Sequence, residues 1–157
     1  QPAWSQLATD GYVGEFGRND QPDAIDESRR PESHDLGDGR LLLAVPTRQF
    51  DDGVAATGFA MFLFDPDNVD SLAFRTWGYV GTVQAGSDNS AACEGGVLTC
   101  AVSTGAISLE TDPQSQLPAI RVTLSGEAVS GPGQVRSLGP TDELVFKFDA
   151  NAGQYQP

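Results

Sequence analysis

The fold of this chain is decided by VAATGFAMFLF at residues 54–64, DPDNVD at 65–70 and SLAFRTWGYVGTVQ at 71–84. Two apolar stretches of strand length here flank a loop of turn-forming residues, an order typical of neighbouring antiparallel strands. We therefore expect one strand over 54–64 and a second over 72–84.

Strand patterns recur along the rest of the chain. Further strands are expected at 11–17, 40–45, 91–93, 99–102, 106–110, 119–125 and 143–149. Pro46 is expected to end the strand over 40–45, since proline has no amide to donate to a sheet. Period-two alternation is clearest in the last two strands, where it directs to the core Ile120, Val122, Leu124, Leu144, Phe146 and Phe148.

Eight or nine short strands without a helical period predict an all-β fold. The expected architecture is a single-domain antiparallel β-sandwich or jelly roll, and a closed β-barrel is the alternative. A length of 157 residues suits one domain over 1–157. The 18 glycines and 10 prolines favour turns over helices.

Two polar segments stand outside this pattern. Residues 18–39 are rich in acidic side chains and are expected to form a long loop, while 150–157 is expected to be a C-terminal tail. Asp20 and Pro22 could begin one short helix that runs to about Arg30.

Cys93 and Cys100 are the only cysteines. Their spacing favours a disulfide that closes a β-hairpin, with a four-residue loop over 95–98 and positive φ at Gly95 or Gly96. So short a ring stabilises a fold by only about 2.5 kcal/mol. Two free thiols and half of a metal site are the alternatives. A disulfide indicates an oxidising compartment, and the chain begins at Gln1 without an apolar leader, so we expect a secreted or cell-surface protein.

The charge balance restricts the partners. Twenty-two acidic residues oppose nine basic ones, for a net charge of -13. Such a chain repels phosphate backbones and anionic lipids, so no nucleic acid partner is expected. No apolar run is long enough to cross a bilayer, so no membrane insertion is expected either.

Two groups of residues are candidates for binding an ion or a proton. Asp65, Asp67, Asn68 and Asp70 offer oxygen ligands for calcium, but an Asx-rich turn explains them too, because the helix-loop-helix calcium pattern is not met. His34, beside Asp35 and Asp38, has the chemistry of a general base but no recognisable nucleophile. Calcium is thus the one cofactor for which the sequence offers ligands.

Arg75, Trp77 and Tyr79 share one face of the strand over 72–84. This combination suits either stacking on a sugar ring or packing against another subunit. The alternative is a half-buried face on which Arg75 covers the rings.

The common catalytic motifs are absent, including Gly-x-Ser-x-Gly, His-Glu-x-x-His and the P-loop. We therefore expect a non-enzymatic protein. The first hypothesis is a structural subunit of a surface filament, pilus or coat, which binds copies of itself through a strand or a terminal segment. The alternative is a secreted module that binds carbohydrate or calcium, with a glycan as the partner.

Overall fold

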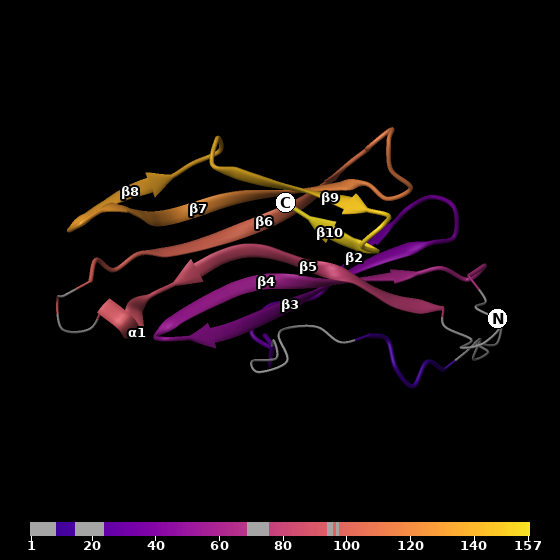
Figure 1. Ribbon diagram of the computed structural model, residues 1–157, viewed down its shortest axis with the longest axis horizontal. Coiled ribbons are helices and arrows are strands. Elements are labelled where there is room, and N and C mark those ends of the chain that lie inside the picture. Colours follow the sequence, from indigo (N-terminus) through magenta and orange to yellow (C-terminus); the bar gives the residue numbers. More distant parts are fainter. Residues whose placement is uncertain (1–8, 15–23, 69–75, 94–95, 97) are drawn as a thin grey trace, which may run out of the picture.

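A computed structural model describes residues 9–14, 24–68, 76–93, 96 and 98–157, and antiparallel strands account for most of these residues (Figure 1). The strands are β1 (Ala24–Ile25), β2 (Glu32–Asp35), β3 (Leu41–Asp51), β4 (Val54–Phe64), β5 (Trp77–Asp88), β6 (Val102–Glu110), β7 (Ala119–Gly131), β8 (Gln134–Leu138), β9 (Glu143–Asp149) and β10 (Gln154–Gln156). Within the described part, the single helix is α1 (Ser90–Cys93). The predicted all-β class is confirmed.

The strands belong to one sheet, in the order β1-β3-β4-β5-β6-β7-β9-β10. β2 pairs with β3 beyond the end of β1, and β8 pairs with β7 beyond the end of β9. Strands that are adjacent in the sheet are thus mostly consecutive in the sequence, so the sheet is a meander. The sheet is not closed into a barrel.

The sheet folds over so that its two halves face each other across one core. β5 and β6 pair only over Gly86–Asp88 and Val102–Thr104, and from there the two strands separate (Figure 1). At the far end, β10 packs against β5. The core draws on both halves: Leu42, Phe59, Met61 and Val83 come from β3 to β5, and Ile120, Val122, Phe146 and Tyr155 come from β7, β9 and β10. The arrangement is a two-layer β-sandwich.

The hairpin of β3 and β4 has the most regular register in the sheet. Leu41 pairs with Phe64, and the ladder continues without a shift to Asp51 and Val54. Asp52 and Gly53 both have positive φ, at 48° and 81°. Two such residues between paired strands are what a tight type I′ hairpin requires.

The expectation that Pro46 ends a strand is wrong, because β3 continues to Asp51. The Pro46 carbonyl accepts a hydrogen bond from the Asp26 amide at 2.9 Å, so the amide-free side of Pro46 faces β1 and β2, not β4. β2 pairs with β3 up to Ala44, and β1 pairs from Thr47. The missing donor therefore falls in the gap between two edge strands, where it costs no ladder bond.

The strict alternation expected in β5 is interrupted by two glycines. Val80 and Val83 are both in the core, although they are an odd number of residues apart. Register shifts in the pairing with β4 accompany Gly81 and Gly86, which have φ of 114° and 134°. Each bulge turns the following side chain to the other face.

The polar segments contain more structure than expected. β1 and β2 lie within 18–39, and residues 24–30 form a strand and a turn instead of the end of a helix; 18–23 lie outside the described residues. The tail over 150–157 includes β10, because the aromatic Tyr155 is buried. At the N-terminus, 11–14 is not a strand, although the Tyr79 amide donates to the Val13 carbonyl at 2.8 Å; 15–17 lie outside the described residues.

Candidate functional site

A row of four side chains crosses four neighbouring strands on the outer face of the sheet, the face opposite the core residue Leu42. Asp35 of β2 pairs with Leu41 of β3, Leu41 with Phe64 of β4, and Phe64 with Trp77 of β5. Directly opposed residues project to the same face, so this register sets a carboxylate, an aliphatic side chain and two aromatic rings side by side.

This row lines a hollow of about 420 Å³, whose remaining wall is formed by Gly37, Gly39 and Arg40. The Trp77 and Phe64 rings are 5.1 Å apart between centroids and inclined at 47°. Trp77 is half-buried, so one part of the indole packs on Phe64 and another part faces the hollow. An apolar surface with a few polar groups at its rim is the usual composition of a small-molecule pocket.

The turn between β2 and β3 shapes the rim of this hollow. The Leu36 amide donates to the Arg40 carbonyl at 3.1 Å, and the Asp35 Oδ1 atom accepts the Gly37 amide at 2.8 Å. Gly37 and Gly39 have φ of 83° and 88°, which disfavours other residues. Because neither glycine has a side chain, the space beside Trp77 stays open.

Arg40 is held in place at this rim by two acceptors. Its Nε atom donates to Asp38 Oδ2 at 2.8 Å, and its Nη2 atom donates to the Gln116 carbonyl at 3.2 Å. The hydrogen bond from Arg40 lowers the pKa of the Asp38 carboxyl from its ordinary value and raises the pKa of Arg40. Both groups therefore carry their charges at neutral pH.

Two residues of the predicted face, Trp77 and Tyr79, are described, and they lie in different surroundings. Trp77 lines the hollow, whereas the Tyr79 ring contacts Phe62 at 5.8 Å between centroids and the Tyr79 hydroxyl bonds Thr82 at 2.8 Å. Arg75 lies outside the described residues. Sequence reasoning did not connect Trp77 with Phe64, because that contact depends on the register between two strands.

His34 does not join this site. It pairs with Leu42 and therefore projects to the opposite face from Asp35. Its Nε2 atom is buried and lies 3.6 Å from Glu32 Oε2. The three residues of the predicted group are thus separated: His34 and Asp35 lie on opposite faces of β2, and Asp38 lies in the turn that follows.

The predicted calcium loop is organised as an Asx turn where the structure describes it. The Asp65 Oδ1 atom accepts the amides of Asp67 at 3.1 Å and Asn68 at 3.2 Å. Asp70 lies outside the described residues. Among the residues that are described, no three His, Cys, Asp or Glu side chains gather in a way that could hold a metal ion.

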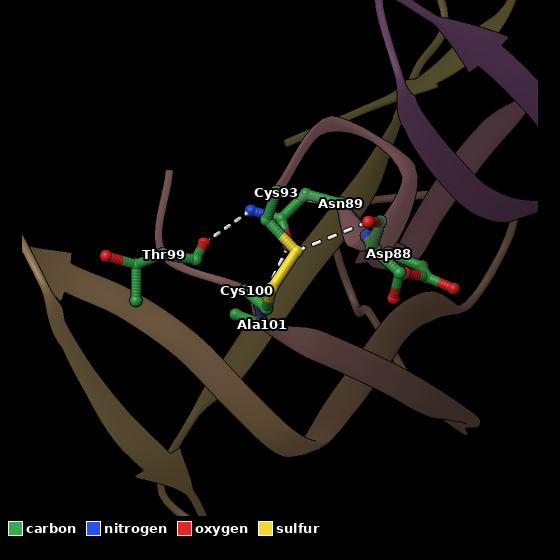
Figure 2. The surroundings of a disulfide bond; sticks show 7 residues. Asp88, Asn89, Cys93, Thr99, Cys100 and Ala101 are labelled. Atoms are coloured by element: carbon green, nitrogen blue, oxygen red, sulfur yellow. Dashed lines mark hydrogen bonds between the residues drawn. A yellow bond between two sulfur atoms is a disulfide. The ribbon is translucent and has the colours of Figure 1, made fainter. Parts of the chain in front are cut away.

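The Cys93–Cys100 disulfide is present, with a Cα–Cα distance of 5.3 Å (Figure 2). The hairpin expected around it is wrong, because Cys93 ends the helix α1 and Cys100 precedes β6. Asp88 accepts the Ser90 amide at 2.8 Å, and this cap favours a helical turn over a strand. Gly96 has a positive φ of 76°, as predicted for one of the two loop glycines.

Asn89 completes the connection around the disulfide. Its side chain accepts the Ala101 amide at 2.7 Å and donates to the Thr99 carbonyl at 2.8 Å (Figure 2). These bonds substitute for a strand pairing on the segment that carries Cys100. The disulfide and Asn89 together fix the two ends of the loop between β5 and β6.

Comparison with protein-family models, with curated proteins and with solved structures finds no match to this chain.

Proposed function

We propose that this protein is a non-enzymatic carbohydrate-binding module, and that the hollow beside Trp77 receives one sugar ring. The observation that carries the proposal is the row of Asp35, Leu41, Phe64 and Trp77 along one wall of a hollow of about 420 Å³. A single sugar ring in this hollow could contact both the aromatic side chains and the hydrogen-bonding groups.

The chemistry of the row suits a sugar. The C–H face of a pyranose is apolar and packs on an indole, while its hydroxyls both donate and accept hydrogen bonds. Asp35 supplies an acceptor and Arg40 a donor, and each is already oriented by bonds within the turn. A rim ordered before binding loses little entropy when the ligand arrives.

A secreted or cell-surface location is part of the proposal. Disulfides form and persist in oxidising compartments, and Cys93 and Cys100 are paired. No helix in the described part of the chain has the length and apolar character needed to cross a membrane. Extracellular glycans would be the accessible ligands in such a location.

Isothermal titration with a panel of soluble mono- and oligosaccharides tests the proposal. Trp77→Ala is expected to weaken binding at least about tenfold, which corresponds to about 1.4 kcal/mol. Phe50→Ala is the matched control, because Phe50 is an exposed aromatic residue that does not line the hollow. Thermal unfolding of both variants establishes that they are folded. Equal affinities for Trp77→Ala and the wild type, or no binding across the panel, would refute the proposal.

A second candidate function is the structural subunit of a filament, pilus or coat. The observation that favours it is an exposed apolar group on one face of β6, β7 and β8: Val129 pairs with Val135, and Val102 projects to the same side. Exposed apolar surface of this kind commonly marks contacts with another protein. Sedimentation at high concentration tests this candidate, and Val129→Asp is expected to abolish any association seen there.

A further inference from the structure

A second hollow lies next to the one beside Trp77. It has a volume of about 310 Å³ and shares Asp35 and Arg40 with the first hollow. Its other wall comes from the end of β6 and the connection to β7, including Glu110, Asp112 and Gln116. The two hollows therefore adjoin at Asp35 and Arg40.

The wall of the second hollow is built before any ligand binds. Leu117 is buried, its amide donates to the Ser115 hydroxyl at 3.2 Å, and the Ser115 amide donates to the Asp112 carbonyl at 3.1 Å. The neighbouring Pro118 carbonyl accepts the Tyr155 hydroxyl at 2.9 Å. These bonds tie the connection to the core and to β10.

The polar groups of this hollow differ in how far they are already engaged. Both carboxylate oxygens of Glu110 accept from Arg121, at 2.6 and 2.8 Å. Asp112 uses Oδ1 for the Gln114 amide at 3.0 Å. No described residue bonds its Oδ2 atom, so Asp112 keeps an acceptor for a ligand.

We propose that the two hollows form one groove, and that this groove binds an uncharged linear oligosaccharide of at least two units. One ring packs on Trp77, and the next crosses Arg40 into the polar hollow beside Asp112. This inference rests on the proposed carbohydrate-binding function and specifies its ligand.

The groups at the junction suit the hydroxyls of an uncharged chain. Arg40 and Asp35 border both hollows, so a hydrogen-bond donor and an acceptor lie at the junction. A hydroxyl accepts from the one and donates to the other. The net charge of -13 adds a general repulsion of acidic polysaccharides.

The first test is the dependence of affinity on chain length. Glucose and xylose oligomers of one to six units, with α- and β-1,4 linkages, are titrated into the intact protein by calorimetry. Affinity is expected to rise about tenfold from one unit to three and then to level off. Affinity that is independent of length overturns the groove but leaves the single-ring function standing. Absence of binding to every oligomer overturns both.

A variant pair locates the second unit. Asp112→Asn is expected to weaken trisaccharide binding about fivefold and to leave monosaccharide binding unchanged. Asp149→Asn is the matched control, because Asp149 also accepts an amide two residues ahead, at 2.8 Å from Asn151, yet lines neither hollow. Equal effects of the two substitutions would overturn the proposed groove. Tighter binding of chitosan or polygalacturonate oligomers than of neutral ones would overturn the uncharged ligand.

Discussion

Gly81 and Tyr155 lie in direct contact where β10 crosses β5. A Cβ atom on Gly81 would stand 2.8 Å from the Tyr155 amide nitrogen. The Tyr155 side chain is buried in the core at this point, and burial raises the pKa of its hydroxyl. The C-terminal strand can therefore close the sandwich only over a residue without a side chain.

The first prediction concerns this contact. Gly81→Ala is expected to lower the free energy of unfolding by at least about 1–3 kcal/mol, because it combines the clash with a φ of 114° that alanine disfavours. Gly78→Ala is the control, since a Cβ there meets no atom within 4 Å, and it is expected to change stability by less than about 0.5 kcal/mol. Urea unfolding measures both, and equal effects would contradict the role assigned to Gly81.

The second prediction distinguishes two neighbouring arginines. Arg29 donates to the carbonyls of Thr47 and Gly58 at 2.8 and 2.9 Å, and its guanidinium lies 5.0 Å from the centroid of the Phe59 ring. Arg29→Ala is expected to destabilise the fold by about 1.5–3 kcal/mol. Arg30→Ala removes the same charge from an exposed position and is expected to have little effect. Chemical denaturation measures the free energy of unfolding of both variants. A similar loss in both would show that the hydrogen bonds of Arg29 contribute no more to stability than an exposed charge does.

The third prediction concerns the disulfide. Replacing Cys93 and Cys100 together by alanine is expected to lower the free energy of unfolding by about 2.5 kcal/mol, because the unfolded chain regains the entropy of a short loop. The wild type reduced with dithiothreitol serves as the matched comparison and is expected to lose a similar amount. Urea unfolding measures both samples. An unfolding midpoint equal to that of the oxidised wild type in both would show that the hydrogen bonds of Asn89 hold the loop between β5 and β6 without the disulfide.

The fourth prediction follows from Asp26. Hydrogen bonds from Ser28 and Arg29 hold the pKa of its carboxyl below the ordinary value of 3.8. A group with a lowered pKa stabilises the fold above the unfolded pKa, and that stabilisation is lost as the pH falls through the folded pKa. Asp26→Asn is therefore expected to be less stable than the wild type near neutral pH, and the difference is expected to vanish in strong acid.

Thermal unfolding across the acidic range measures this convergence. Glu27→Gln is the control, because it removes a charge from an exposed neighbouring position. A stability difference for Asp26→Asn that stays constant from neutral pH to strong acid would show that the carboxylate charge is not what stabilises the turn.

The sequence predicts which side chains of the candidate site share a face of one strand, but not which side chains meet across several strands. The shared face of Trp77 and Tyr79 follows from alternation and is seen in β5. Joining Trp77 to Asp35 requires three successive strand registers, from β5 through β4 and β3 to β2. Period-two patterns specify which way a side chain points, but they do not specify its neighbour on the next strand.

By itself, the sequence determined the all-β class, the bounds of β4 and β9, and the pairing of Cys93 with Cys100. These features depend on local alternation or on having only two cysteines. The tertiary structure alone decided that Gly81 reverses the faces of β5 and that Asp35 stands in line with Trp77. The reason is that bulges and registers are selected by contacts between segments far apart in the chain, and such contacts leave no periodic trace in either segment.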